Sequence, residues 1–432
     1  MYNEKLLLDN LHAGVIPATG CTEPIAVAFA AANCMSYIED YTYIKSINVY
    51  VSPNIMKNTM AVLVPGVEEP GLAVAAAAGV IAGNPNAGLG VISNINQSQI
   101  PIIKKMAHCG KIKTKIADVQ DDLYVNVGIE TESENIKVYI AGNHTNIYKI
   151  EKNGQCILKK SRPIAHEKSK LKEYMQTVSL RDIWNFSINT QLEKISFMKE
   201  ADTMNWQIAK EGLKHSYGLN LGKSIIKSKD VDFDNDLQSM ILAYTTAASD
   251  ARMGGAMLPA MSNSGSGNQG ITASVPLSVV SRYLNVDDEK IIRAQTLSHL
   301  TAIYAHSFLP ILGAFCATDT AAMGAAAGIC YLFGKNYDVM SMAIKNMAGD
   351  APGMICDGAG ASCAMKVGTS VSSMYKAVQL AFDGICIPAT NGLVCEDVDL
   401  TIRGIGHLGT EGLKNADSAI LDIMMDKIKI ER

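Results

Sequence analysis

The stretch of sequence that decides the fold reads AQTLSHLTAIYAHSFLPILGAFCATDTAAMGAAAGICYLFG and covers residues 294–334. It contains no Lys or Arg and is rich in alanine and glycine, whose small side chains let helices approach one another closely. We expect one long helix over residues 288–306 and another over residues 320–333. The stretch lacks the run of about 18 apolar residues that a membrane-spanning helix needs, because polar and helix-breaking residues interrupt it: His299, His306, Pro310 and Asp319.

The sequence around this stretch is of two kinds. From about residue 171 onward nearly every segment has helical spacing, and further long helices are expected over residues 236–252 and 364–382. Residues 44–158 instead carry β-branched, roughly alternating segments around one helical piece, and Asn153-Gly154 is typical of a hairpin turn between the last two strands. We predict an α+β fold in which a smaller α+β domain, residues 41–165, is inserted into a mostly helical domain formed by residues 1–40 and 166–432.

Composition excludes several classes of protein. The chain has 432 residues, of which 48% are hydrophobic and 19% charged, a balance typical of globular proteins and not of disordered or collagenous ones. Its 38 basic and 42 acidic residues give a net charge of -4 without any basic block, so we expect no nucleic-acid partner. Glu4 and Asp9 stand where a signal peptide would carry basic residues. We expect a cytoplasmic protein that has no membrane partner.

The ten cysteines are not equivalent. Cys21 lies in the turn GCTEP, residues 20–24, immediately before an Ala-rich helix, with Thr22 as a candidate cap. The positive end of a helix dipole stabilises a thiolate, so we expect a lowered pKa for Cys21. Four others lie inside Ala-rich helices or beside strand turns, where a cysteine is usually a small packed residue: Cys34, Cys109, Cys156 and Cys330.

Three further cysteines favour a metal centre. Cys316 directly precedes the helix expected near residue 320, while Cys356 and Cys363 bracket the sequence DGAGAS. A helix would separate these last two by about 10.5 Å along its axis, so the glycines favour a loop that folds back and places Cys363 at the head of the next helix. The short hooks typical of zinc sites are missing, whereas iron–sulfur clusters tolerate irregular spacing. The alternatives are competing ligands at Cys386 and Cys395, or cysteines that bind no metal.

A polar, glycine-rich loop is a candidate anion site. Residues 262–270 read SNSGSGNQG and lead into a helix, where backbone N–H groups, hydroxyls and amides can bind a carboxylate or a phosphate. The loop matches neither a Walker loop nor a dinucleotide fingerprint. An ordinary flexible loop is the alternative. The candidate substrate-binding residues are Ser264, Ser266, Asn268 and Gln269, with Asn58 as a weaker case. His299 and His306 are expected to be satisfied core residues, and Lys366 a solvated lysine rather than part of a pyridoxal site.

Three motifs in order, GCTEP (residues 20–24), SGSGNQG (264–270) and CDGAGASC (356–363), resemble the L-cysteine desulfidase family over almost the whole chain. That family is related to the catalytic subunit of iron–sulfur L-serine dehydratases. The resemblance implies an oxygen-sensitive lyase that uses a [4Fe–4S] cluster and no pyridoxal phosphate to convert L-cysteine to sulfide, ammonia and pyruvate. By motif, the helical domain would be catalytic, and three cysteines would hold the cluster: Cys316, Cys356 and Cys363.

The resemblance also implies that Cys21 acts near the substrate as a thiolate, either as the base or as a fourth cluster ligand. The serine dehydratases have a longer separation between their last two ligand cysteines than Cys356 and Cys363 have, which favours the desulfidase branch. The rival is an L-serine dehydratase with the same cluster, followed by a non-catalytic metal-binding or thiol-sensing protein, and by a transporter. A small amino acid is the expected partner, and a homodimer is a possible assembly.

Overall fold

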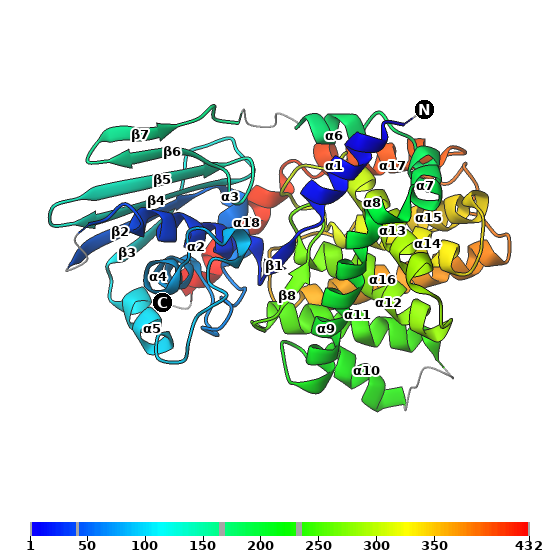
Figure 1. The fold of residues 1–432 in the computed structure, drawn as a ribbon, viewed down its shortest axis with the longest axis horizontal. Helices are drawn as coiled ribbons and strands as arrows, with labels where there is room; N and C mark the ends of the chain where they lie inside the picture. Colours follow the sequence, from blue (N-terminus) through cyan, green and yellow to red (C-terminus); the bar gives the residue numbers. More distant parts are fainter. Residues whose placement is uncertain (1, 40–42, 164–168, 230–235, 431–432) are drawn as a thin grey trace.

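The computed structural model describes residues 2–39, 43–163, 169–229 and 236–430. The fold is α+β and mostly helical, which confirms the class predicted from the sequence. A six-stranded sheet with its covering helices forms one part, and a large helical bundle forms the other (Figure 1). None of the helices in these described ranges is both long enough and apolar enough to cross a lipid bilayer.

The sheet has the strand order β3-β2-β4-β5-β6-β7. β2 is parallel to β3, and every other neighbouring pair in this sheet is antiparallel. The predicted hairpin turn between β6 and β7 is confirmed, since Asn153 and Gly154 have φ angles of +52° and +80°. The strands are β2 (Ile44–Val51), β3 (Ile112–Ile116), β4 (Tyr124–Thr131), β5 (Asn135–Ala141), β6 (Ile147–Lys152) and β7 (Gln155–Lys159).

Helices α2 (Thr22–Met35) and α4 (Leu72–Ala82) share one apolar core with the sheet, and α5 (Ile100–His108) packs beside α4. The division into residues 1–40 with 166–432 and residues 41–165 stays a prediction, because both of its borders adjoin or fall on residues outside those described, 40–42 and 164–168. Within the described residues, α2 packs on the sheet although it falls inside the range 1–40. Half of its residues are alanine, valine or isoleucine, and these buried side chains pack over the strands.

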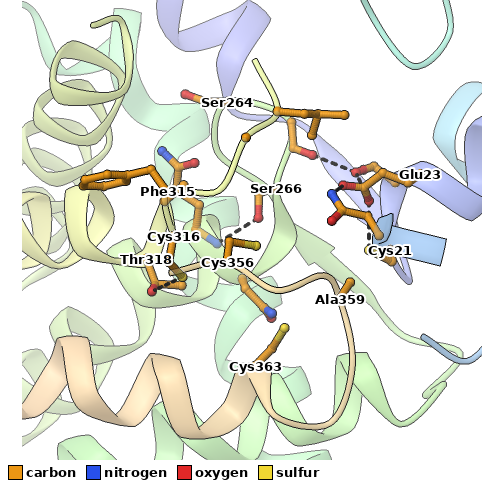
Figure 2. A pocket seen from close by; sticks show the side chains of 18 of the residues that line it. Cys21, Glu23, Ser264, Ser266, Phe315, Cys316, Thr318, Cys356, Ala359 and Cys363 are labelled. Carbon is orange, nitrogen blue, oxygen red and sulfur yellow. Dashed lines mark hydrogen bonds between the residues drawn. The ribbon is translucent and has the colours of Figure 1, made fainter. Parts of the chain in front are cut away.

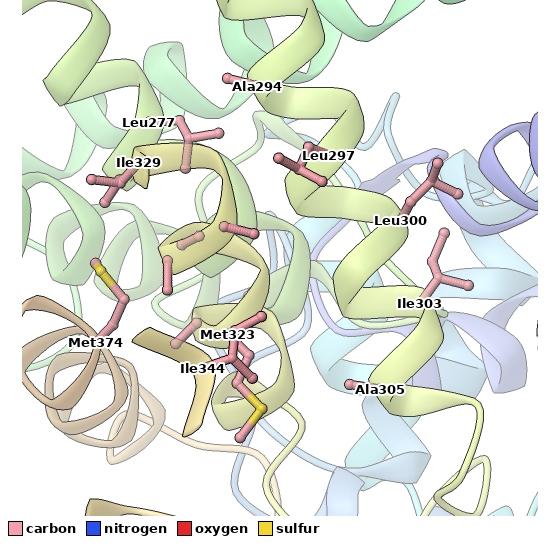
Figure 3. Close-up of a cluster of buried hydrophobic side chains, with 14 of the residues drawn as sticks. Leu277, Ala294, Leu297, Leu300, Ile303, Ala305, Met323, Ile329, Ile344 and Met374 are labelled. Atoms are coloured by element: carbon pink, nitrogen blue, oxygen red, sulfur yellow. The ribbon is translucent and has the colours of Figure 1, made fainter. Parts of the chain in front are cut away.

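The helical part has its own core, shown around α13 and α14 in Figure 3. The helices are α1 (Glu4–Gly14), α6 (Lys170–Met175), α7 (Leu180–Asn189), α8 (Leu192–Ile195), α9 (Lys199–Lys214), α10 (Leu221–Lys229), α11 (Leu237–Met253), α12 (Gly267–Tyr283), α13 (Asp288–His306), α14 (Thr318–Leu332), α15 (Tyr337–Asp350), α16 (Cys363–Phe382) and α17 (Val398–His407). The long helices predicted from spacing agree with these bounds to within two residues. Two more elements, α3 (Pro53–Thr59) and α18 (Ala416–Ile430), pack against each other.

Glycine and alanine explain how α13 and α14 pack so closely. A Cβ atom at Gly324 would lie 2.3 Å from the backbone oxygen of Ser298, a distance that atoms do not tolerate. The interface is therefore built on backbone contact rather than on interlocked large side chains. The helix α14 begins at Thr318, two residues after Cys316.

A short pairing joins the two parts. β1 (Pro17–Thr19) pairs antiparallel with β8 (Pro259–Met261), with Pro17 opposite Met261. The pairing continues past the strands, because the Ser262 N–H donates to the Ile16 oxygen at 2.9 Å and the Ser264 N–H donates to the Gly14 oxygen at 2.9 Å. Residues 14–16 thus lie beside residues 262–264, and the Thr22 hydroxyl, which donates to the Gly265 oxygen at 2.9 Å, places residues 20–24 against the same loop.

Gly324→Ala should lower the melting temperature. The added methyl must push α13 and α14 apart, and such overpacking costs about 1–3 kcal/mol, more than the roughly 0.5–1 kcal/mol that alanine contributes in a helix interior. Thermal unfolding followed by circular dichroism measures this. Gly404→Ala in α17 is the matched control, because nothing lies within 4 Å of its added methyl. Equal melting temperatures for the two variants would contradict the close packing.

Candidate active site

A cavity of about 120 Å³ lies where the two parts meet. All nine residues singled out from the sequence line it: Cys21, Asn58, Ser264, Ser266, Asn268, Gln269, Cys316, Cys356 and Cys363. In the view of Figure 2, the last three cysteines lie on one side of the site and Cys21 lies with Glu23 on the other. The competing candidates Cys386 and Cys395 are not among the lining residues. The structure therefore brings the nine candidate residues together around one cavity.

Cys21 lies at the N-cap of α2, as expected, but its surroundings differ from the expectation. The thiol donates to Glu23 Oε2 at 2.9 Å. Burial raises the pKa of Cys21, and the Glu23 carboxylate adds to the rise. The dipole argument predicted a lowered pKa, and it failed because it included neither the burial of the thiol nor the neighbouring carboxylate. Thr22 does not cap the helix either, since its hydroxyl donates to the Gly265 oxygen at 2.9 Å.

Glu23 is the centre of a buried hydrogen-bond network. Asn58 Nδ2 donates to Glu23 Oε1 at 2.9 Å, Cys21 donates to Glu23 Oε2, and the Thr22 hydroxyl oxygen lies 3.2 Å from that same carboxylate oxygen. Burial alone would raise the pKa of Glu23, but the charge of a nearby His144 and the hydrogen bonds outweigh it, so the pKa is lowered. Burial in turn lowers the pKa of His144, against the opposing charge of Glu23. Burial thus disfavours the charged form of the His144 imidazole, while the hydrogen bonds to Glu23 favour its carboxylate.

Arg252 and His144 are site residues that the sequence analysis missed. Arg252 is 3% exposed at the end of α11, and it forms no ion pair with any residue in the described ranges. Its Nη1 donates to Met253 Sδ at 3.3 Å. His144 is 5% exposed and lies in the turn between β5 and β6. A signal for Arg252 was present, because a basic residue interrupts a run of Ala, Ser and Thr, whereas His144 sits in an ordinary polar turn.

Unpartnered polar atoms converge on the cavity. Among the residues described, eight buried side-chain nitrogen or oxygen atoms have no hydrogen-bond partner, and four of these eight belong to cavity-lining residues: Asn58 Oδ1, His144 Nε2, Arg252 Nε and Gln269 Oε1. Buried polar groups are rarely left without partners, because each one costs free energy that water or a ligand would recover. The cavity is therefore suited to a small polar molecule.

The glycine-rich loop is held from behind by the core. Asn263 Nδ2 lies 3.0 Å from His299 Nδ1, and Asn263 Oδ1 accepts from Gln269 Nε2 at 3.0 Å. His299 is a satisfied core residue, as expected, and burial lowers its pKa to about 3. Asn268 is engaged by Ser249 and Met253, at 3.2 Å and 3.3 Å. The loop is thus a fixed wall, which differs from the flexible-loop alternative.

The start of α12 faces Arg252. Ser266 is the N-cap, and its hydroxyl accepts from the Gln269 N–H at 3.4 Å. A Cβ atom at Gly267 would lie 2.2 Å from Arg252 Nε, so only glycine lets the guanidinium lie against the first turn. A buried cation and a helix N-terminus on one wall form an anion site, which suits a carboxylate.

Two of the cysteine segments are joined by their backbones. The Cys316 N–H donates to the Met354 oxygen at 2.9 Å, and the Cys356 N–H donates to the Ala314 oxygen at 2.7 Å. Cys363 is the first residue of α16, as predicted. Ala317 is the N-cap of α14, and the Thr318 hydroxyl lies 3.0 Å from Cys316 Sγ.

The chemistry of these thiols fits a cationic cluster. Burial raises the pKa of Cys316 and of Cys363, and the neighbouring Cys356 thiol adds to both shifts. Negative charge on three thiols that line one cavity would need a cation to be stable, and a metal would supply it. No group of three His, Cys, Asp or Glu side chains in the described part of the chain is arranged to hold a single metal ion. A four-iron cluster is a larger object, with each protein sulfur on a separate iron.

Two further expectations need correction. His306 is not a plain core residue, because it lines the cavity, where burial lowers its pKa to about 3. Lys366 is not simply solvated, because it lines the cavity and forms an ion pair with Asp357. Periodicity could not reveal either fact, since both depend on which segment packs over the helix end.

Comparisons with known proteins agree with the motifs. A family model described as the serine dehydratase alpha chain matches residues 87–422. A UPF0597 protein of Latilactobacillus sakei subsp. sakei is 56% identical over 427 residues, covering 98% of this chain and 99% of that protein. A UPF0597 protein of Actinobacillus pleuropneumoniae serotype 3 is 44% identical over 427 residues, covering 99% of this chain and 98% of that protein.

The matched family consists of dehydratase-like, lyase-type enzymes that typically use iron and sulfur. This chain belongs to the serine dehydratase alpha chain family.

Gly267→Ala should weaken binding of an amino-acid substrate. The new methyl displaces the Arg252 guanidinium, and losing one hydrogen bond to a charged group costs about 1.5–3 kcal/mol, or roughly ten- to a hundred-fold in kcat/KM. Arg252→Gln should have the same effect. Steady-state kinetics measure it, with Gly404→Ala as the control for adding a methyl to a helix. Unchanged kcat/KM in both site variants would exclude Arg252 from substrate binding.

Proposed function

We propose that the protein is an iron–sulfur-dependent L-cysteine desulfidase, which eliminates sulfide from L-cysteine and yields ammonia and pyruvate. The observation that carries the proposal is the convergence of unpartnered buried polar atoms on a small cavity whose wall also holds Cys316, Cys356 and Cys363. Such a cavity offers groups for the carboxylate and the ammonium of an amino acid next to a thiol cluster. A sensor or storage protein would have no use for the carboxylate site.

In this proposal Cys316, Cys356 and Cys363 each hold one iron of a [4Fe–4S] cluster. Such a cluster, when bound, supplies an iron that lacks a protein ligand and can act as a Lewis acid toward the leaving group. The backbone hydrogen bonds between the segments of Cys316 and Cys356 fix two of the three ligands relative to each other. Cys363 follows a loop with two glycines, which gives it freedom to reach the same centre.

Substrate orientation falls to the chain's own polar groups. Arg252 and the first turn of α12 bind the carboxylate, as their position on one wall suggests. The free oxygens of Asn58 and Gln269 accept hydrogen bonds from the α-ammonium. Contacts to both the carboxylate and the ammonium of the substrate fix the direction in which its α-hydrogen points. Such fixed orientation supplies a large part of the rate enhancement of an enzyme.

Cys21 is the proposed base for the α-proton. The Glu23 carboxylate keeps a proton on the Cys21 sulfur, and the ammonium of a bound substrate would offset that negative charge and favour the thiolate. The proton released from Cys21 has a path to Glu23 along the existing 2.9 Å contact. His144, whose Nε2 has no hydrogen-bond partner among the described residues and whose pKa is lowered by burial, can carry a proton between the cavity and this pair.

The rival substrate is L-serine, which the name of the matching family favours. The choice of cysteine rests on the short spacing between Cys356 and Cys363. Pyruvate release from each amino acid by anaerobically prepared enzyme separates the two. A larger kcat/KM with L-cysteine supports the desulfidase, a larger value with L-serine replaces it with the dehydratase, and no pyruvate from either overturns both.

Changing Cys316, Cys356 or Cys363 to Ala should remove most of the bound iron, because each thiolate holds one iron of the cluster. Iron and acid-labile sulfide, measured after anaerobic purification, report the loss. Cys34→Ala and Cys330→Ala are the matched controls, since both thiols are buried in apolar cores and do not line the cavity. Full iron content in Cys363→Ala together with loss in Cys386→Ala or Cys395→Ala would reassign the third ligand.

Cys21→Ser should leave the cluster in place and lower turnover by about 10²–10⁴-fold, the contribution of a lost acid–base group. Exchange of the substrate α-hydrogen with solvent deuterium should fall by a similar factor, because the same group removes that hydrogen. If Cys21 were instead a cluster ligand, the visible spectrum of the resting enzyme would change before substrate is added. Normal turnover and exchange would exclude both roles.

A further inference from the structure

Lys57 is a fully buried lysine just outside the cavity wall. It lies on α3, one residue before the cavity-lining Asn58, and is 1% exposed. Lysine is seldom buried unless its charge is paired and its donors are satisfied. The surroundings of Lys57 therefore show what the protein uses this charge for.

Its ammonium group has three hydrogen-bond acceptors. Lys57 Nζ donates to the backbone oxygen of Cys356 at 3.0 Å, to that of Gly313 at 3.3 Å and to Asp417 Oδ1 at 2.6 Å. An ammonium has three N–H donors, so the set is complete. The acceptors come from three separate segments of the chain, two of which carry proposed cluster ligands.

The loop between the last two cysteines packs on the same helix. A Cβ atom at Gly358, where φ is +104°, would lie 2.7 Å from the Lys57 backbone oxygen. Gly313 precedes Cys316 by three residues, and Cys356 is itself one of the acceptors. Thus α3, which belongs to the sheet part, holds both cysteine-bearing segments of the helical part at their backbones.

Asp417 completes the arrangement from the C-terminal helix. It lies in the first turn of α18, which packs against α3, and its side chain is 19% exposed. In Figure 1, α18 (red) runs back from the helical part to the sheet part. Removing one partner of a buried ion pair is strongly destabilising, whereas the pair itself mainly specifies a geometry.

We propose that Lys57 and Asp417 form a positioning pair that sets the placement of the Cys316 and Cys356 segments. Neither residue of the pair lines the cavity, and Lys57 acts through the backbone carbonyls of Gly313 and Cys356. The iron readout below rests on the proposed cluster, while the thiol readout does not. The C-terminal helix is thereby part of the site's framework.

The test compares full-length Lys57→Met and Asp417→Asn with wild type. In iron-free protein, peptide mass spectrometry follows alkylation of Cys316, which is 8% exposed, and of Cys34, which is 0% exposed. In both variants the segment that carries Cys316 should open locally more often, although the protein does not unfold globally. The alkylation rate of Cys316 should therefore rise by about tenfold, and that of Cys34 should stay unchanged. Iron content after anaerobic reconstitution should fall in the same variants.

Asp422→Asn is the matched control, since it removes the same charge from an exposed position of α18. Asp417→Glu, which keeps the charge, should restore much of the iron content. Wild-type rates at Cys316 in Asp417→Asn, or equal increases at Cys316 and Cys34, would overturn the proposal, and Asp417→Asn decides alone if Lys57→Met does not fold. A wild-type protein that binds no iron would refute the cluster and leave the thiol comparison as the test of the pair.

Discussion

The site depends on the backbone pairing of β1 with β8. This short antiparallel contact, which lies two residues before Cys21, fixes residues 14–16 against residues 262–264 at the start of the glycine-rich loop before α12. The two segments are more than two hundred residues apart in sequence, and the Thr22 hydroxyl bond to Gly265 extends the contact into the cavity. Backbone pairing is well suited to this purpose, because its register does not depend on the flexibility of long side chains.

Once these segments are joined, the electrostatics of the cavity follow from burial. Glu23 keeps its negative charge because hydrogen bonds and His144 outweigh the penalty of burial. Arg252 forms no ion pair with a carboxylate in the part of the chain that the structure describes. A buried cation and a buried anion that do not pair with each other leave a field across the cavity, and a zwitterion that matches the field can align with it.

The sequence predicted the fold class, the long helices and the residues that line the cavity. These features depend on local periodicity, on glycine-rich turns and on cysteines at helix ends, all of which can be recognised in the sequence alone. Arg252 and His144 were missed, because their importance comes from burial without a partner. The pKa of Cys21 was misjudged because it also depends on burial. A helix end can be recognised in the sequence, but a buried thiol in contact with a buried carboxylate cannot. The position of α2 on the sheet likewise depends on long-range packing.

The cavity wall is shared between the sheet part, which supplies Asn58 and His144, and the helical part, which supplies Arg252 and the three clustered cysteines. This shared construction constrains how the family can diverge. A chimera that combines the sheet part of one relative with the helical part of another would inherit two intact cores and a mismatched cavity. Substitutions in the cavity walls of the sheet part and of the helical part must therefore be compatible. The two parts are expected to evolve as one unit although each has its own hydrophobic core.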